Sequence, residues 1–307
     1  MKKITIIVPC YNEQEVLPLF FEEIQKQFNP TYLFQLVFVD DGSKDQTLSI
    51  IRDYAKQYPF VKYISFSRNF GKESAMLAGL KAAKDLNSDA AIIIDADLQH
   101  PPVLIKEMIT YFEEGYKHIY ARQNNREKES FIRTFFALAF YRVYAFFTGF
   151  KNMNQGAVDF CLIDRDVIDA FLEIKDVNRF TKGIFSWVGY EKKCLDFDHT
   201  PRAAGHTKWS FWGLWKYAFL GIKQFSRFYL FLFSLLLVIG FGFFAVDIIL
   251  DISRQTFSYV SLKLDVFIIL ILLGLRTITK LLYDIRDQSL NRPIYLTKES
   301  NISHDTH

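Results

Sequence analysis

The sequence predicts an α/β protein with a largely parallel sheet covered by helices on both faces, followed by two long apolar segments. Short apolar, β-branched runs alternate with stretches of helical spacing through residues 1–121. That alternation is typical of a parallel sheet with crossover helices. The chain is also 50% hydrophobic with 32 Phe, and its mean hydropathy is +0.06. Such an apolar excess is unusual beside 23% charged residues, and it predicts that apolar residues are concentrated in one part of the chain.

The strands are predicted from runs rich in Ile, Val and Phe, and the helices from apolar positions three and four residues apart. Ile4–Val8 ends at Pro9, so this run is too short for a signal-peptide core and reads as a buried strand. Pro101 and Pro102 suit the first turn of a helix. The predicted strands are Ile4–Val8, Leu33–Val39, Val61–Phe66, Ala90–Ile94 and His118–Ala121. The predicted helices are Glu13–Phe28, Asp45–Tyr58, Lys72–Leu86 and the segment from Pro101 to Gly115.

Charge and cysteine usage exclude several classes of protein. The net charge of +3, without a block of Lys and Arg, argues against a nucleic-acid partner. The three cysteines, Cys10, Cys161 and Cys194, are odd in number and far apart, so they form no disulfide framework. No Cys/His spacing typical of zinc sites occurs.

The C-terminal apolar segments predict a transmembrane hairpin at residues 228–285. The first span, about 228–250, carries Asp247 as its one formal charge and is long enough for the ~30 Å hydrocarbon layer. The second, about 262–282, has charged residues near its ends. Basic residues flank the pair, so the positive-inside rule predicts both termini in the cytoplasm and a multi-pass protein of the plasma membrane, the bacterial inner membrane.

Four further segments complete the predicted organisation. Residues 1–210 form a cytoplasmic domain, within which the aromatic-rich segment 131–150 is either an ordinary core helix or an interfacial helix. Residues 211–227 are predicted to be a juxtamembrane interfacial helix. Residues 286–307 are predicted to be a cytoplasmic tail, which is polar and mobile after Pro293.

Acidic residues follow three of the predicted strands, at Pro9–Glu13, Val39–Ser43 and Asp95–Gln99. The carboxyl ends of parallel strands meet at one edge, so we expect these groups to share a cleft. Clustered carboxylates need a cation, and hard oxygen ligands suit Mg²⁺ or Mn²⁺. Asp95 and Asp97, with the amide of Gln99, are the candidate metal ligands, while Asp40 and Glu13 suit sugar hydroxyls or base edges. Each motif alone is common; the three in this order indicate a nucleotide and metal site.

The chain resembles the polyprenyl-phosphate branch of glycosyltransferase family 2, which includes bacterial GtrB-type glucosyltransferases and dolichyl-phosphate mannosyltransferases. The resemblance covers nearly the whole chain and includes the three acidic strand ends. Its more specific elements are Arg68-Asn69-Phe70-Gly71-Lys72 and Arg202-Ala203-Ala204-Gly205-His206-Thr207-Lys208. It further includes Pro101-Pro102, Asp159-Phe160 and Asn178-Arg179-Phe180. It implies a nucleotide-diphospho-sugar transferase fold of the GT-A type, with residues 1–210 as the catalytic domain.

The resemblance also implies roles for individual residues. The nucleotide-sugar would be bound by Pro9, Tyr11, Glu13, Asp40, Asp41, Lys72 and Asp95. The metal would be held by Asp95, Asp97 and Gln99. The lipid phosphate would be bound by Arg122, Arg133, Arg202 and Lys208. The catalytic group would be Asp97, Asp159, Arg202 and Lys208, with Asp159 near the transferring sugar. Many relatives have Arg where this chain has Cys161, which removes a candidate phosphate or sugar contact.

The implied reaction is metal-dependent transfer of one sugar, with inversion, from a nucleotide-sugar to undecaprenyl phosphate. A phosphate monoester is largely dianionic at pH 7, so it needs cationic positioning by Arg and Lys rather than a general base. A UDP-sugar is the predicted donor, with glucose and N-acetylglucosamine both open. The lipid-linked product would serve cell-envelope glycosylation, with a flippase and a downstream transferase as partners. A homo-oligomer is a further possibility.

Two other functions remain open. Gln224-Phe225-Ser226-Arg227-Phe228 approximates the Gln-x-x-Arg-Trp of processive polysaccharide synthases, although Phe replaces Trp and two spans are too few for a channel. The other is a non-catalytic membrane scaffold with a nucleotide-sugar fold, in which unused clustered carboxylates would be a burden on stability. Product length tests the first, and metal-dependent protection by a nucleoside diphosphate tests the second.

Overall fold

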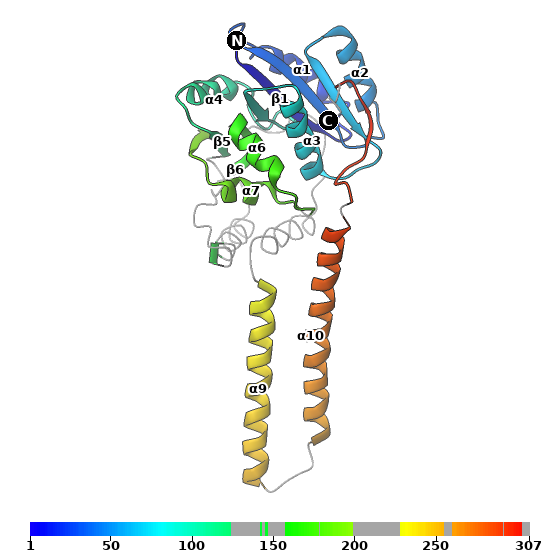
Figure 1. Cartoon of the computed structure of the whole chain (residues 1–307), viewed down its shortest axis with the longest axis vertical. Coiled ribbons are helices and arrows are strands. Elements are labelled where there is room, and N and C mark those ends of the chain that lie inside the picture. The colour runs from blue at the N-terminus through cyan, green and yellow to red at the C-terminus, as the bar shows by residue number, and fades with distance from the viewer. Residues whose placement is uncertain are drawn as a thin grey trace.

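A computed structural model of the protein describes residues 1–123, 142, 145–146, 157–177, 179–198, 228–254, 260–290 and 292–302. Within them one sheet has the strand order β7-β5-β6-β4-β1-β2-β3-β8 (Figure 1). The strands are β1 (Lys3–Cys10), β2 (Leu33–Asp40), β3 (Val61–Phe66), β4 (Ala90–Ile93), β5 (His118–Gln123), β6 (Ala157–Asp164), β7 (Lys192–Phe197) and β8 (Thr297–Ser300). The helices are α1 (Leu17–Gln25), α2 (Thr47–Gln57), α3 (Lys72–Asp85), α4 (Leu104–Glu113), α6 (Arg165–Glu173), α7 (Thr181–Val188), α9 (Phe228–Arg254) and α10 (Val260–Ser289).

The centre of the sheet is parallel, as the alternation of strands and helices predicted. β4, β1, β2 and β3 pair in parallel, and so do β5 and β7. β6 lies between β4 and β5 and is antiparallel to both. The sheet is therefore mixed, and the start of β6 lies at the same edge as the end of β4.

Alternate side chains of each strand enter the two hydrophobic cores, because successive residues of a strand point to opposite faces. In β1, Ile4, Ile6 and Val8 pack with α1, α2 and α4, whereas Ile7 packs on the opposite face with α3. The second core also takes buried residues of α6 and α7. Helices therefore cover both faces, as predicted (Figure 1).

α1 begins at Leu17, four residues later than the sequence predicted. The residues between β1 and α1 form a turn in which Asn12 has φ +52°. That turn is fixed from outside, since Ser43 Oγ accepts from Asn12 N at 2.9 Å and Thr47 Oγ1 from Glu13 N at 2.8 Å. Pro18 then occupies the first turn of the helix, where its missing N–H costs nothing.

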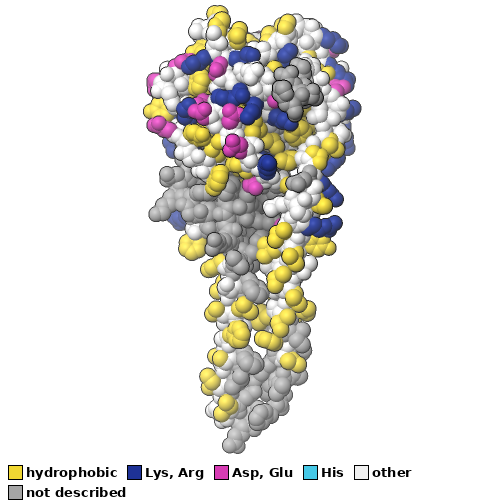
Figure 2. Space-filling model, in the orientation of Figure 1, with side chains coloured by type: hydrophobic (Ala, Val, Ile, Leu, Met, Phe, Trp, Pro, Cys, Tyr) yellow, Lys and Arg dark blue, Asp and Glu magenta, His cyan; other side chains and the backbone are white. Residues whose placement is uncertain are grey.

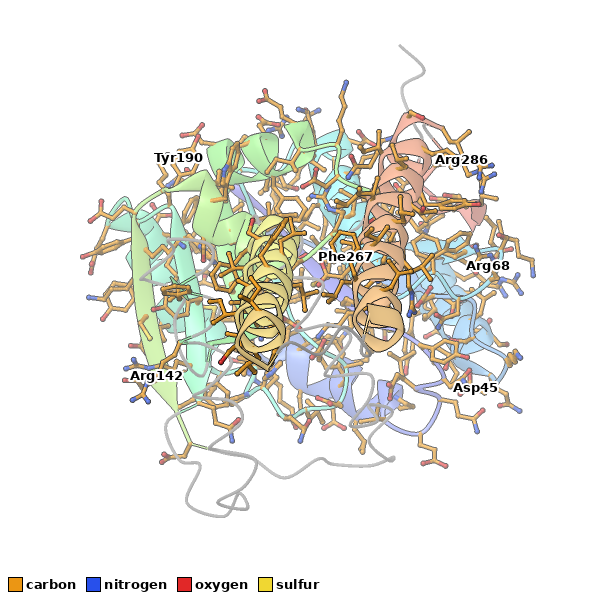
Figure 3. All side chains as sticks on the ribbon, turned by 90° about the horizontal axis from the view of Figure 1, so that it is seen from below. Asp45, Arg68, Arg142, Tyr190, Phe267 and Arg286 are labelled. Atoms are coloured by element: carbon orange, nitrogen blue, oxygen red, sulfur yellow. The ribbon has the colours of Figure 1, made fainter. Side chains whose placement is uncertain are left out.

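α9 and α10 run side by side away from the sheet and expose many apolar side chains (Figures 1 and 2). The helices approach closely where Gly240 faces Leu270, since a Cβ at Gly240 would lie 2.5 Å from Leu270 Cδ1. Figure 3, seen from below, shows Arg68 and Arg286 on the α10 side and Arg142 and Tyr190 on the α9 side.

The predicted transmembrane hairpin is not found. Among the described residues, no helix combines the length and the apolarity needed to cross a bilayer. Charged residues reduce the apolar length of α10, which carries Arg276, Lys280 and Asp284 in its C-terminal half. The multi-pass plasma-membrane location inferred from the sequence is contradicted by this finding. The predicted helix at 211–227 lies outside the described residues, as does most of segment 131–150.

The C-terminal segment after α10 returns to the sheet, where the sequence predicted a mobile tail. β8 pairs antiparallel with β3, and Leu296 O accepts from Ser67 N at 2.9 Å. The Arg52 guanidinium makes a bidentate contact with Glu299 at 2.6–2.7 Å. The Tyr295 ring stacks on Phe66 with 4.8 Å between centroids. The polar composition of β8 gave no sign of a strand in the sequence. The strand forms because its backbone pairs with β3, which is distant in the chain.

Candidate active site

The ends of β1 and β2 meet, as the acidic strand ends predicted. Asp41 N donates to Cys10 O at 2.8 Å, which joins the two strand ends directly. Asp40 is buried and accepts from Ser43 N at 3.1 Å and from Ser65 Oγ at 2.8 Å. Pro9 is the next-to-last residue of β1, and Tyr11 and Glu13 follow in the turn before α1, half-buried at the same edge. These five predicted residues therefore share one edge of the sheet.

Asp41 holds the loop that precedes α3. Its two carboxylate oxygens accept from Phe70 N at 2.6 Å and from Gly71 N at 2.9 Å. Burial raises the pKa of Asp41 to about 6, although the two backbone hydrogen bonds oppose the shift. The neighbouring Gly42 has φ +69°, and a Cβ there would lie 2.5 Å from the carbonyl carbon of Arg68. The backbone at Gly42 packs closely against the backbone at Arg68, which explains why residue 42 is a glycine. This packing also sets where α3 begins.

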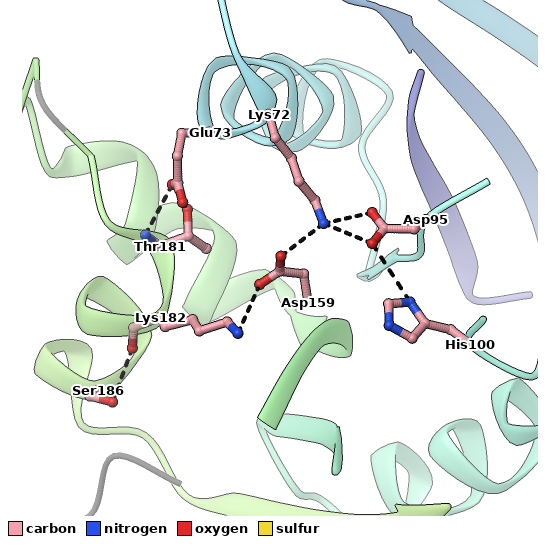
Figure 4. Close-up of polar contacts among 8 residues, drawn as sticks. All are labelled: Lys72, Glu73, Asp95, His100, Asp159, Thr181, Lys182 and Ser186. Carbon is pink, nitrogen blue, oxygen red and sulfur yellow. Dashed lines mark hydrogen bonds and ion pairs between the residues drawn. The ribbon is translucent and has the colours of Figure 1, made fainter. Parts of the chain in front are cut away.

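Lys72, the first residue of α3, joins two acidic residues from different strands (Figure 4). Its ammonium lies 2.7 Å from Asp95 Oδ1 and 2.8 Å from Asp159 Oδ2. The sheet register explains the meeting. Ile93 of β4 pairs with Cys161 of β6, so Asp95, two residues beyond Ile93, is level with Asp159, two residues before Cys161. The predicted residues Lys72, Asp95 and Asp159 thus form one ion-paired cluster.

The charges in this cluster reinforce one another. Burial alone would raise the pKa of Asp159, but the Lys72 and Lys182 ammonium groups lower it well below its usual range. Burial would likewise lower the pKa of Lys72, whereas Asp159 and Asp95 raise it above its usual range. Lys72 and Asp159 are therefore both charged at neutral pH, and Asp159 has little tendency to accept a proton.

Two residues of the site, Thr181 and Lys182, belong to none of the motifs from which the site was predicted. Lys182 lies 3.7 Å from Asp159 Oδ1, on the oxygen that Lys72 does not use (Figure 4). Thr181 donates both its backbone N–H, at 3.0 Å, and its hydroxyl to Glu73 Oε2. The nearest sequence signal was the Asn178-Arg179-Phe180 element, which directly precedes this pair.

His100 is a buried neighbour of Asp95 and was also missed. Its Nδ1 lies 3.9 Å from Asp95 Oδ2 and has no hydrogen-bond partner among the described residues. The ring stacks on Phe160 with 5.7 Å between centroids. Burial lowers the pKa of His100, and the positive charge of Lys72 lowers it further. The neighbouring carboxylates raise it by less, so the imidazole is neutral at pH 7.

Asp97 and Gln99 belong to a tight turn after β4. Asp97 is buried and accepts from Gln99 N at 3.1 Å. Leu98 between them has φ +58°, an unusual conformation for a residue with a branched side chain. No group of three or more His, Cys, Asp or Glu side chains suited to a metal occurs in the described part of the chain. Two carboxylates and an amide are nevertheless the hard oxygen donors that Mg²⁺ uses together with substrate phosphates, so the residues fit such a metal.

The residues predicted to bind a lipid phosphate are only partly described. Arg122, near the end of β5, makes a bidentate ion pair with Asp196 of β7, at 2.6 and 2.9 Å, with both side chains exposed. Arg133, Arg202 and Lys208 lie outside the described residues. Cys161 is buried in the core shared with α3, and burial raises the pKa of its thiol. At that position this chain thus contributes to packing.

Comparisons with known proteins agree with this geometry. The glycosyl transferase family 2 model matches residues 5–172, which run from the third residue of β1 through β6 and most of α6. The chain is 32% identical to the SfII prophage-derived bactoprenol glucosyl transferase of Shigella flexneri, over 97% of this chain and 98% of the relative. It is 34% identical to an uncharacterized glycosyltransferase of Synechocystis sp., over 97% and 95%.

One solved structure supports the fold. Mannosyl-3-phosphoglycerate synthase from Rubrobacter xylanophilus superposes with a TM-score of 0.51 at 16% identity, over 72% of each chain. The mixed, mostly parallel sheet is accordingly GT-A-like, as the resemblance implied. With the matched family model and relatives covering almost the entire chain, the protein belongs to glycosyl transferase family 2 and is a glycosyltransferase.

Proposed function

We propose that this enzyme transfers a single sugar from a nucleotide-sugar to a polyprenyl phosphate, with inversion at the anomeric carbon. The observation that carries the proposal is the charged cluster of Lys72, Asp95 and Asp159 at the carboxyl edge of the sheet, where α/β folds bind ligands. The acceptor is suggested by the bactoprenol glucosyl transferase of Shigella flexneri, which the chain matches from end to end.

The donor would lie over the ends of β1 and β2. Pro9, Tyr11 and Glu13 line that edge, while Asp40 and Asp41 shape it through their hydrogen bonds to Ser43, Ser65 and the 70–71 backbone. Lys72 would supply positive charge to the diphosphate. We propose a UDP-sugar carrying glucose or N-acetylglucosamine.

Asp95, Asp97 and Gln99 would hold Mg²⁺ or Mn²⁺. Such an ion neutralises negative charge that develops on a departing nucleoside diphosphate. The chain's own part is to hold the two carboxylates in place close to the donor. Lys72 holds Asp95 by ion pairing, and Asp97 lies in the tight turn after β4, where it accepts from Gln99 N.

The acceptor needs positioning rather than deprotonation, because a phosphate monoester is largely dianionic at pH 7. Arg202 and Lys208, with Arg122 and Arg133, are the proposed cationic groups. Asp159 would lie beside the transferring sugar. Its carboxylate is held by two ammonium groups, so it would orient the sugar or stabilise positive charge at the anomeric carbon.

The direct test incubates the purified protein with a panel of nucleotide-sugars and undecaprenyl phosphate, with and without a chelator. We expect one sugar per lipid, formed from one donor of the panel and abolished by chelation. A polymeric product would instead support a processive synthase. No transfer from any donor, with metal present, would sink the proposed function.

Replacing Asp97 with Asn tests the metal site. We expect turnover to fall by roughly two orders of magnitude or more, because a charge at the leaving group is lost. Asp53→Asn, at an exposed position on α2, is the matched control and should behave as wild type. Near-normal transfer by Asp97→Asn would contradict the mechanism.

A further inference from the structure

Two pairs of adjacent residues face each other across the site. Lys72 and Glu73 begin α3, and Thr181 and Lys182 begin α7. Glu73 accepts two hydrogen bonds from Thr181, while both lysines point at Asp159 (Figure 4). The contact between Glu73 and Thr181 therefore joins the starts of the two helices. With the helices joined in this way, both lysines bind the same carboxylate, that of Asp159.

We propose that Lys182 is a positioning residue for the transfer reaction, which fixes the Asp159 carboxylate from the side opposite Lys72. This inference rests on the proposed function and adds to it a residue that the sequence motifs did not include. Glu73 and Thr181 act indirectly. Their contact with each other sets the separation of the two lysines.

Lys72 contacts two carboxylates, and this is the physical reason why Asp159 needs a second lysine, Lys182. Lys72 shares its three N–H donors between Asp95 and Asp159, so a donor diphosphate that attracts Lys72 loosens its hold on Asp159. Lys182 lies on the other carboxylate oxygen, 3.7 Å away, and keeps Asp159 both paired and oriented. A carboxylate with only 19% of its side chain exposed is costly to leave unpaired.

The start of α7 is anchored independently of Lys182, which makes its role separable from folding. Arg179, with 3% exposure, donates to Ile174 O at 2.6 Å and to Phe171 O at 3.2 Å. Its guanidinium also lies 4.5 Å from the centre of the Phe171 ring. These contacts join α7 to the end of α6, while Lys182 has 29% of its side chain exposed. Loss of the Lys182 charge should therefore leave the fold intact.

The test compares Lys182→Gln with Lys182→Arg in the transfer assay. We expect Lys182→Gln to lower kcat about tenfold or more while KM for the donor changes less than about threefold, because small misplacements of reacting groups slow the chemical step. Lys182→Arg keeps the charge and should recover most of kcat. Lys175→Gln, an exposed lysine between α6 and α7, is the matched control.

Thr181→Val is the second variant, and it removes the hydroxyl bond to Glu73 while preserving side-chain shape. We expect it to lower kcat by a smaller factor, about threefold, with Tm close to wild type. An unchanged kcat in Lys182→Gln would overturn the inference. So would a loss of kcat that parallels a fall in Tm and is not recovered by Lys182→Arg, since that pattern indicates a purely structural role.

A readout without turnover separates this inference from the proposed function. Carboxyl ¹³C chemical shifts of Asp159, followed against pH in the resting protein, should show a higher pKa in Lys182→Gln than in wild type. If no donor is used by the wild-type protein, the proposed function fails. An unchanged Asp159 titration in Lys182→Gln contradicts the contact between Lys182 and Asp159 itself.

Discussion

Asp41 is a buried carboxyl group. Burial disfavours its charged form in the folded protein, although its two backbone hydrogen bonds favour that form. Its folded-state pKa of about 6 lies above the ordinary value of 3.8, because burial outweighs the two backbone N–H groups that favour the ion. The folded protein therefore binds this proton more tightly than the unfolded chain. The resulting stability is fully present below about pH 4 and is lost as the pH rises to about 6.

The Asp41→Asn variant tests that linkage. We expect the free energy of unfolding of the wild-type protein to fall between pH 4 and pH 6 by at most about 3 kcal/mol more than that of the variant. Denaturant titrations at half-unit pH steps measure the difference. Asp53→Asn, at an exposed site, should retain the wild-type slope. Identical slopes in Asp41→Asn and wild type would show that Asp41 is not the group responsible.

At the scale of single elements, α3 decides where Lys72 lies. The helix packs directly on β1, and a Cβ placed on Gly79 would be 2.1 Å from Ile7 Cγ2. Ile7 is fully buried in the middle of the sheet and has no room to move away. The absence of a side chain at Gly79 therefore allows the close approach of α3, whose first residue enters the site.

Gly79→Ala should destabilise the protein despite the better helix propensity of alanine. The propensity gain is about 1 kcal/mol, whereas overpacking a buried contact costs about 1–3 kcal/mol and more where neither side can shift. The free energy of unfolding, measured with urea, is expected to fall. Lys81→Ala, on the exposed side of the same helix, should change it little. A more stable Gly79→Ala protein would mean that α3 and β1 can separate without cost.

At the scale of the whole molecule, β8 connects α10 to the edge of the catalytic sheet. Asn301, directly after β8, is one polar anchor, since its Oδ1 accepts from Tyr63 N at 2.7 Å and its Nδ2 donates to Val61 O at 3.2 Å. The neighbouring Ile302 is buried. β3 leads from this contact into the loop that Asp41 holds and then into Lys72. The C-terminal segment thus supports the strand that precedes the site.

Asn301→Ala should weaken this attachment. We expect a loss of about 1–3 kcal/mol in the free energy of unfolding, because Tyr63 N and Val61 O both lose their partners. Amide hydrogen exchange of Tyr63 and of residues 296–302 should become faster. Lys298→Ala, an exposed neighbour on β8, is the control. Unchanged exchange at Tyr63 in Asn301→Ala would show that β8 is held by other contacts.

Local sequence patterns were sufficient for the central strands and for the acidic strand ends. β3 has the bounds that its apolar run predicted, and Asp40, Asp41 and Asp95 meet at one edge because parallel strands end together. The same patterns were misleading for the C-terminal apolar segments, where the transmembrane hairpin is not found, and for the tail, which forms β8. The periodicity of apolar residues indicates which side chains are expected to be shielded from water. It does not indicate which part of the protein or its surroundings shields them.

The sequence by itself determined the fold class and the family, because the alternation of strands and helices and the motifs that mark the family are read directly along the chain. Only the tertiary structure decided that Asp159 lies level with Asp95, and that Lys72 and Lys182 approach it from opposite sides. Those meetings require β6 to insert antiparallel beside β4 and α7 to dock against α3. Contacts between residues so distant in sequence arise from the packing of whole elements, and no local pattern encodes them.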